Sequence, residues 1–194
     1  MSERSGKRSE LELRARAKVQ RSGLRDLSFR SLADEVGVKS SSVHYYFPEK
    51  RDLTATLIHN YSNDFQVHLA RVSSDNISLF SKLMAFVDLF EEAATDDKLC
   101  LCGMLAAEIL ALDKECRSLL EEFFKAAESW LVDVLNDHKA DVVSSLPPTE
   151  LAAVMMSGLE GALLLDRVQG ASVHLQAQRQ LISSLVIKER SLQG

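Results

Sequence analysis

A short run of hydroxyl-bearing, aromatic and basic side chains is chemically the most informative part of the chain. A helix expected over residues 40–46 would present one exposed face, made of Lys39, Ser40, Ser41, Ser42, His44 and Tyr45. This face contains no carboxylate. Hydroxyl, imidazole and ammonium groups donate hydrogen bonds to phosphates and to base edges, so the pattern predicts a surface that contacts nucleic acid.

The residues before this face have the spacing of a helix-turn-helix. Ala33 and Gly37 lie four positions apart, and Val43 lies six positions beyond Gly37. Two short helices that cross near a right angle leave no room for a large side chain, which favours alanine at the crossing. The turn between them needs a positive φ, which glycine adopts at little cost. The small core between the helices is expected to contain Leu32, Val36, Val38 and Val43.

The sequence lacks the common catalytic and metal-binding patterns. It contains no nucleotide-binding loop, HExxH, CxxC or Gly-x-Ser-x-Gly elbow. Cys100 and Cys102 form a CxC pair with no histidine nearby to complete a zinc site. We therefore expect no enzymatic activity, no catalytic residues, no metal site and no cofactor.

Charge is distributed unevenly along the 194 residues, which carry a net charge of −5. Residues 1–60 hold 12 Lys and Arg against 8 Asp and Glu, a balance of +4, which leaves −9 for residues 61–194. A basic head on an acidic body predicts that the head meets a polyanion. The alternative is a helical protein-interaction module that does not bind DNA, and such an adaptor would not need a basic head.

Cysteine usage and hydropathy predict the compartment. Three cysteines, an odd number, argue against a disulfide framework and fit a reducing cytoplasm. There is no run of about 18 apolar residues, so no membrane span is expected. The polar N-terminus lacks the apolar region of a secretory signal. We expect a cytoplasmic protein without a membrane partner.

The periodicity of apolar residues predicts an all-α fold of about nine helices. The apolar stripes and helix-ending glycines and prolines place them at residues 9–22, 28–36, 40–46, 49–70, 77–90, 99–111, 114–138, 149–168 and 172–188. Pro48 marks a boundary. We expect a DNA-binding domain at 1–48 and a helical ligand-binding and dimerisation domain at 49–194.

The segments RSLADEVGV and VHYYFPEK carry a resemblance to a known family. They resemble the DNA-binding head of the tetracycline-repressor (TetR) family, in which a short recognition helix ends in a Tyr-x-Tyr-Phe run and a lysine opens the connecting helix. Tyr46, Phe47, Pro48 and Lys50 occupy the matching places. The resemblance implies a homodimeric transcriptional regulator, a repressor that binds a palindromic operator in double-stranded DNA and releases it when a small-molecule inducer binds.

The resemblance also implies roles for individual residues of the head. Ser28, Arg30 and Lys50 are expected to contact phosphates, and Tyr46 the DNA backbone. The positive end of the helix that Lys50 opens favours an anion there. The expected major-groove surface comprises Lys39, Ser41, Ser42, His44 and Tyr45, with Ser40 beside them.

The body offers two kinds of inducer site. Cys100 resembles a cysteine that, in one subgroup of the family, opens a helix and responds to oxidants or electrophiles, and Glu108 matches the glutamate of an Ala-Ala-Glu run. The alternative is a non-covalent apolar inducer, with the cysteines as buried hydrophobes. The expected lining consists of Phe65, Phe86, Phe90, Cys100, Met104, Glu108, Phe123 and Trp130.

The last two helices carry more apolar surface than one packing face requires. Small residues on the first of them permit close helix approach, and pairing with symmetry mates would form a four-helix interface. The expected dimer residues are Leu151, Met155, Gly158, Leu159, Ala162, Leu181, Ile182 and Leu185.

Overall fold

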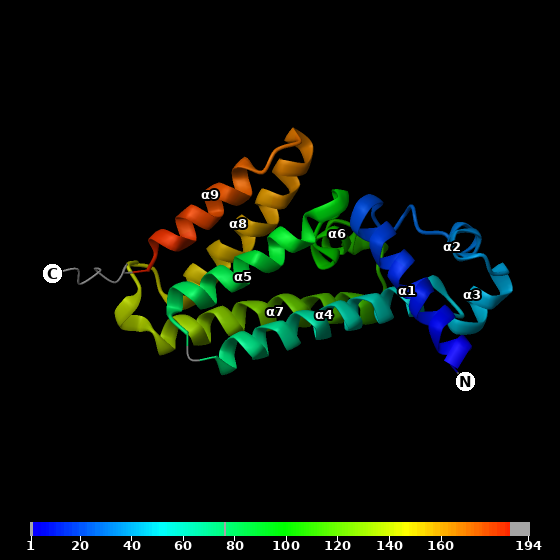
Figure 1. The fold of residues 1–194 in the computed structure, drawn as a ribbon, viewed down its shortest axis with the longest axis horizontal. Coiled ribbons are helices and arrows are strands. Elements are labelled where there is room, and N and C mark those ends of the chain that lie inside the picture. The colour runs from blue at the N-terminus through cyan, green and yellow to red at the C-terminus, as the bar shows by residue number, and fades with distance from the viewer. Residues whose placement is uncertain (1, 76, 187–194) are drawn as a thin grey trace. The chain divides into compact units, whose positions relative to one another are not determined.

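The computed structural model of the protein describes residues 2–75 and 77–186. Within these residues the chain forms nine α-helices, three short 3-10 turns and one isolated β-bridge between Val142 and Val186 (Figure 1). The helices are α1 (Ser2–Ser22), α2 (Phe29–Val36), α3 (Ser40–Tyr46), α4 (Lys50–Ser74), α5 (Leu79–Ala93), α6 (Leu101–Ala107), α7 (Lys114–Asp137), α8 (Pro148–Gln169) and α9 (Val173–Ser184). The all-α prediction is confirmed.

The helices group into two compact units. Unit 1 comprises residues 2–65 and 94–124, and unit 2 comprises residues 66–75, 77–93 and 125–186. The long helices α4 and α7 each contribute to both units. By packing, therefore, α6 and the first part of α4 belong with the N-terminal helices. The functional division at residue 48 stays a prediction.

Helix α1 begins seven residues earlier than its apolar stripe indicates. Leu11, Ala15 and Val19 are fully buried, as their spacing predicts. The earlier turns are polar and are supported by ion pairs on the helix surface, from Lys7 to Glu10 at 3.1 Å and from Arg8 to Glu12 at 2.8 Å. Helical turns that are stabilised by surface ion pairs leave no apolar periodicity in the sequence, so the periodicity could not predict them.

The α2–turn–α3 hairpin follows the sequence closely. The Ser28 hydroxyl caps α2 by accepting the backbone N–H of Ser31 at 3.1 Å. Gly37 ends the helix with φ 69°, in the left-handed region predicted for it. Leu32, Ala33, Val36 and Val43 are buried between the helices. In Figure 1, α1, α2 and α3 lie together in the N-terminal part of unit 1.

Helix α6 is shorter than the segment predicted for it. The periodicity indicated one helix over 99–111, but α6 ends at Ala107 and a 3-10 turn follows at Ile109–Ala111. The Arg117 guanidinium holds this turn by donating to the Leu112 carbonyl at 2.8 Å and the Leu110 carbonyl at 3.4 Å. This contact comes from the next helix, so local periodicity cannot reveal it.

Unit 2 is built on α5, α8 and α9, which pack on one another. Leu83, Phe86, Val87 and Phe90 of α5 are buried, whereas Phe80, three residues before Leu83, is 42% exposed. The α5 helix starts at Leu79, where the Ser78 hydroxyl accepts the Ser81 N–H at 3.2 Å.

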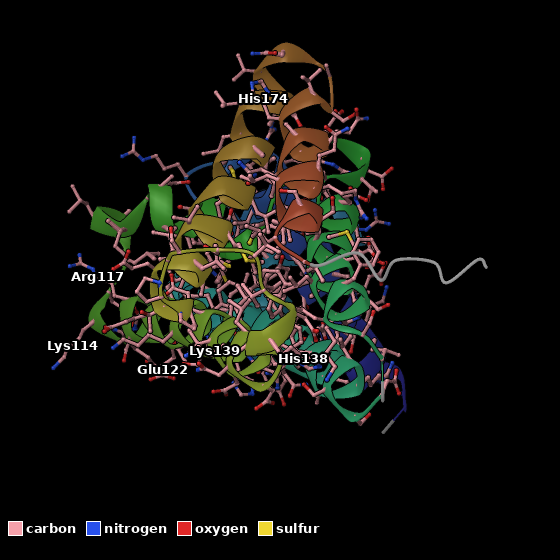
Figure 2. The ribbon with its side chains drawn as sticks, turned by 90° about the vertical axis from the view of Figure 1, so that its left-hand side faces the viewer. Lys114, Arg117, Glu122, His138, Lys139 and His174 are labelled. Carbon is pink, nitrogen blue, oxygen red and sulfur yellow. The ribbon has the colours of Figure 1, made fainter. Side chains whose placement is uncertain are left out.

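An α8–α9 hairpin turns at Gly170, whose φ is 65°. Figure 2 places His174 at this turn. The predicted end of the last helix at residue 188 lies outside the described residues, and α9 ends at Ser184. No helix in the described part of the chain is both long enough and apolar enough to cross a membrane.

Candidate nucleic-acid interface

The predicted DNA-contacting residues gather on the solvent side of α2, α3 and the start of α4. Val43 and Phe47 anchor α3 from beneath, each at most 1% exposed. Of the residues between these two anchors, His44 and Tyr45 point to solvent and Tyr46 is half-buried. The predicted set divides into exposed residues, Ser28, Arg30, Lys39, Ser40, Ser41, His44 and Tyr45, and half-buried ones, Ser42, Tyr46 and Lys50.

Aromatic contacts fix the outer face of α3. The His44 ring meets the Phe29 ring edge-on at 4.9 Å, and Tyr45 meets Tyr46 edge-on at 5.2 Å. Tyr45 is nevertheless 72% exposed. A large aromatic side chain held at that exposure offers both a hydroxyl and a ring face to a base edge or a phosphate.

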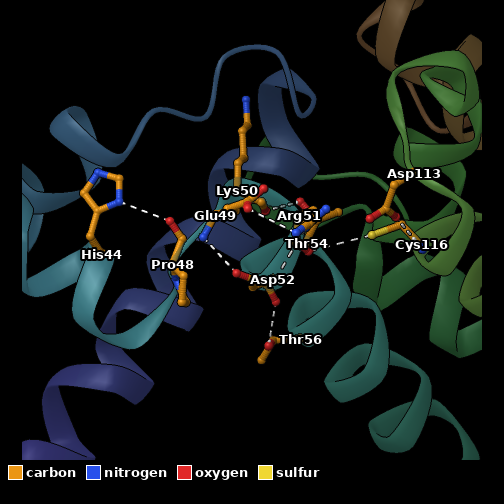
Figure 3. Close-up of polar contacts among 10 residues, drawn as sticks. All are labelled: His44, Pro48, Glu49, Lys50, Arg51, Asp52, Thr54, Thr56, Asp113 and Cys116. Carbon is orange, nitrogen blue, oxygen red and sulfur yellow. Dashed lines mark hydrogen bonds and ion pairs between the residues drawn. The ribbon is translucent and has the colours of Figure 1, made fainter.

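The junction between α3 and α4 is tightly hydrogen-bonded (Figure 3). His44 Nδ1 lies 3.3 Å from the Pro48 carbonyl oxygen, and the backbone N–H of Glu49 donates to the Asp52 carboxylate at 2.8 Å. Lys50 is the first residue of α4, next to the positive end of that helix. Burial lowers the pKa of Lys50, and the negative charge of Glu108 opposes this effect.

Hydrogen bonds and ion pairs from two basic side chains join α1 to α2 and α4. The Lys18 ammonium donates to the Ser31 hydroxyl at 2.8 Å and to the Glu35 carboxylate at 3.1 Å. The Lys18 hydrogen bond is the main cause that holds the pKa of Glu35 below its ordinary value. Arg16 donates to Asp64 at 2.7 Å and lies over the Tyr61 ring. Two basic residues of α1 thus join it to α2 and to α4 within unit 1.

The head of the chain is similar in sequence to a known family of regulators. The sequence profile described as "Bacterial regulatory proteins, tetR family" matches residues 14–57, which run from α1 into α4. The chain belongs to the tetR family. This TetR-family protein is a DNA-binding transcriptional regulator, and the comparisons do not favour the interaction module without DNA binding.

Similarity to the TetR family extends beyond the head. An uncharacterized HTH-type transcriptional regulator in the lacX 3' region of Lactococcus lactis subsp. lactis is 25% identical over 77% of this chain and 78% of its own. A TetR transcriptional regulator from Legionella pneumophila is 26% identical over 93% of this chain and 97% of its own, with a TM-score of 0.86. A TetR-family regulator from Agrobacterium tumefaciens is 25% identical over 95% of this chain and its own full length, with a TM-score of 0.88.

The predicted inducer lining of this TetR-family regulator falls into two aromatic clusters, one in each unit. In unit 1, the ring centroid of Phe123 lies 5.1 Å from that of Phe65 and 5.7 Å from that of Tyr61. In unit 2, Phe86 stacks on Trp130 at 5.6 Å and lies 5.5 Å from Phe90. The Trp130 indole N–H donates to the Ser73 hydroxyl at 2.7 Å. Phe65, Phe86, Phe90 and Phe123 are buried, whereas Trp130 and Met104 are half-buried.

All three cysteines of the TetR-family regulator are buried. Cys100 and Cys102 are at most 2% exposed. The Tyr61 hydroxyl donates to Cys100 Sγ at 3.5 Å. Burial is the main cause that raises the pKa of Cys116 to about 12, with the neighbouring Asp113 carboxylate adding to it. Among the described residues, no three His, Cys, Asp or Glu side chains are grouped to hold a metal ion.

A groove of about 290 Å³ runs between α1 and α4 within unit 1. Two polar contacts cross it, with Arg16 bonded to Asp64 and the Asn60 amide donating to Glu12 at 3.2 Å. Its lining consists of Ser9, Glu12, Leu13, Arg16, Leu57, Asn60, Asn63 and Asp64. None of these residues was predicted to contact an inducer.

Glu108 points toward the head of the TetR-family regulator. It was predicted to line the inducer site, but its carboxylate accepts the backbone N–H groups that follow α1, from Leu24 at 2.7 Å and Arg25 at 3.2 Å. Sequence reasoning missed this contact. The one signal for it is Gly23, whose missing side chain leaves room for the carboxylate.

The predicted dimer residues lie mostly in the interior of unit 2. Leu151, Met155, Leu159, Ala162 and Ile182 are at most 3% exposed within one chain. Gly158 is half-buried, and a Cβ there would collide with Gln178 of α9, so this glycine serves the α8–α9 contact. Leu185 is half-buried and Leu181 is 49% exposed. The strongly exposed apolar residues of this hairpin are Val154, Leu164, Leu165, Val168, Val173 and Leu181.

Proposed function

We propose that this regulator is a repressor, which binds a palindromic operator as a homodimer and releases it when a small inducer binds in its body. The observation that carries the proposal is the outward face of α3. Its serines, His44 and Tyr45 stand on a buried anchor without a carboxylate among them. Residues 1–48 would act as the DNA-binding domain and 49–194 as the ligand-binding and dimerisation domain.

The head residues divide into two roles. Ser28, Arg30, Tyr46 and Lys50 would contact the DNA backbone, since they lie at helix starts or beside the α3–α4 junction. Base edges would be contacted by Lys39, Ser40, Ser41, Ser42, His44 and Tyr45. The two heads of a homodimer are related by two-fold symmetry, which makes the operator palindromic, and heads that read successive major grooves must lie about 34–36 Å apart along the duplex.

Dimerisation would use the exposed side of the α8–α9 hairpin. Val154, Gly161, Leu165 and Val168 follow one another at spacings of seven, four and three, so they share one face of α8. Leu181 of α9 and Leu185 directly after it would complete the interface, while Gly158 of α8 would let α9 pack closely beneath it. The buried members of the predicted set would support this face from beneath.

A non-covalent apolar inducer fits the body better than an electrophile. Reactive cysteines are exposed and hold a stabilised thiolate, whereas Cys100 is 2% exposed. The aromatic clusters around Phe123 and around Phe86 supply apolar surface for such an inducer. One observation still favours Cys100 as a sensor, since the Tyr61 hydroxyl that donates to its sulfur would stabilise a thiolate. The regulator would have no enzymatic activity and would work in the cytoplasm, where its three free cysteines stay reduced.

Selection of bound sequences from a random duplex pool would test the proposal. We expect a palindrome with two half-sites about 10 base pairs apart, or a multiple of that spacing. The selected duplex should bind on the order of 10³-fold more tightly than random DNA at physiological salt. Enrichment of no sequence, or of an asymmetric one bound by a single chain, would contradict it.

A further inference from the structure

The Glu108 carboxylate occupies an anion-binding turn at the end of α1. One oxygen accepts the Leu24 N–H at 2.7 Å, and the other accepts the Arg25 N–H at 3.2 Å and lies 3.6 Å from the Arg25 Nε. The Glu108 side chain is only 16% exposed. Hydrogen bonds from a carboxylate to successive backbone N–H groups are charge-assisted and are stronger than those between neutral partners.

Gly23 makes this approach possible. Its φ of 85° lies in the left-handed region, which side-chain-bearing residues rarely adopt. A Cβ at this position would overlap the Glu108 carboxylate itself. The turn therefore depends on glycine both for its backbone conformation and for the space that the carboxylate fills.

The chain entering α6 is bonded to α1 as well. The Leu99 N–H donates to the Gln20 carbonyl at 3.1 Å, and the Gln20 amide donates to the Leu99 carbonyl at 2.9 Å. Gln20 is 6% exposed. Both ends of the α6 segment are thus hydrogen-bonded to the last turn of α1 or to the residues directly after it.

The charge of Glu108 also reaches the proposed DNA surface. Its attraction acts on Lys50, where it opposes the lowering of the pKa by burial. Lys50 opens α4 and is the proposed phosphate contact. The same carboxylate thus holds the chain that leads into α2 and acts on the electrostatics of Lys50.

We propose that Glu108 is a positioning residue for operator binding. By holding the turn at Leu24 and Arg25, it sets where the α2 cap at Ser28 lies relative to α4. The proposal rests on the proposed phosphate contacts of Ser28 and Lys50. Loss of the carboxylate should lower affinity for the operator while leaving affinity for random DNA equal or higher, because the head loses its orientation and a negative charge together.

Fluorescence anisotropy with the selected operator and with a scrambled duplex would test this role. We expect Glu108→Ala to weaken operator binding by about tenfold and Glu108→Gln by less, since the amide keeps one acceptor. Random-duplex affinity should stay unchanged or rise by up to about twofold. The matched control is Glu122→Gln, which removes the same charge from an exposed position on α7 (Figure 2). It should leave the ratio of the two affinities as in the wild type.

Chemical rescue distinguishes positioning from a general loss of stability. Formate or acetate added to Glu108→Ala should restore part of the operator affinity, with chloride at equal ionic strength as the comparison. Equal affinity losses for both duplexes, or operator binding like the wild type, would overturn the inference. If the alanine variant does not fold, Glu108→Gln is judged by the same ratio. A wild type that does not prefer its operator would overturn the proposed function, and this inference with it.

Discussion

Asp166 at the end of α8 binds His174 at the start of α9 through both the backbone and the side chain. Its carboxylate accepts the N–H of His174, the N–H of Leu175 and lies against Nδ1 of His174, each at 2.8 Å. One acidic side chain thus caps the helix that follows it. The cap closes the hairpin on which the proposed dimer interface stands.

Replacing Asp166 with asparagine should destabilise the hairpin. Loss of the charged cap is expected to reduce the free energy of unfolding by about 1–2 kcal/mol at pH 7. Burial raises the pKa of Asp166, but the hydrogen bonds from His174 and Leu175 outweigh it, and the net pKa lies below the ordinary value. The contribution is therefore complete above about pH 4 and is lost as the pH falls through the folded-state pKa.

Urea unfolding of wild type and Asp166→Asn at a series of pH values would measure this effect. The two stabilities should differ at pH 7 and converge in acid. His174→Gln is the control, because it keeps both backbone N–H donors and should cost much less. A constant difference between wild type and Asp166→Asn down to pH 2 would contradict the assignment.

Charged substitutions on α8 should separate dimerisation from folding. Val168 is 86% exposed and Leu159 is fully buried. Val168→Glu should raise the dimer dissociation constant by about 100-fold or more, since it places an unpaired charge in an apolar interface of roughly 1,500 Å². Leu159→Ala should instead cost about 2–5 kcal/mol of stability.

Analytical ultracentrifugation and thermal unfolding of both variants would check this difference. Val67→Glu is the matched control, because Val67 is 42% exposed in the unit 2 part of α4 and lies outside the α8–α9 hairpin. A Val168→Glu protein that remains dimeric at micromolar concentration would contradict an interface on this face.

The head could be predicted from sequence because its determinants are local. Gly37 ends α2 and Val43 is buried under α3, and both effects operate within a few residues of the chain. The start of α1 could not be predicted from apolar spacing, since its first turns are polar. Helix α3 begins at Ser40, with Lys39 at its N-cap, as the expected bounds of 40–46 require.

Prediction was weaker wherever distant segments meet. Glu108 and Gly23 are far apart in the chain, and only the fold brings them into contact. The apolar spacing of α8 marks both a buried face and an exposed one. Met155 and Leu159 therefore matched the expected pattern of an interface while packing in the interior of their own chain.

Thiol reactivity should separate the two classes of inducer. Because all three cysteines are buried, we expect native protein at pH 7 to resist maleimide, with Cys116 the slowest since its pKa is about 12. Peptide mapping after brief labelling would show this, with labelling in urea as the control. If Cys100 is labelled rapidly, and Cys100→Ser no longer releases DNA upon treatment with an electrophile, the covalent inducer gains the stronger support.

The raised pKa of Cys116 also predicts sensitivity to alkali. A neutral buried thiol contributes stability that is present below its unfolded pKa of about 8.5. That contribution is lost as the pH rises toward about 12. Cys116→Ala should therefore lose less stability than the wild type between pH 8 and pH 10, which urea unfolding would measure. Equal losses in both proteins would show that this thiol does not govern the alkaline limit.

Tyr45 and Lys50 should affect DNA binding in different ways. Lys50→Ala should weaken binding to all duplexes about equally, because it removes a phosphate contact. The slope of log binding constant against log salt concentration should become shallower by about one for each head. Tyr45→Ala should cost about 1–3 kcal/mol on the operator and much less on random DNA, because its ring stands exposed on the proposed base-reading face. Lys114→Ala is the control for charge, since Lys114 is an exposed lysine on α7 (Figure 2). Anisotropy titrations over a salt series would resolve the two effects. If Tyr45→Ala lowers the affinity for operator and random DNA equally, Tyr45 contacts the DNA backbone rather than a base.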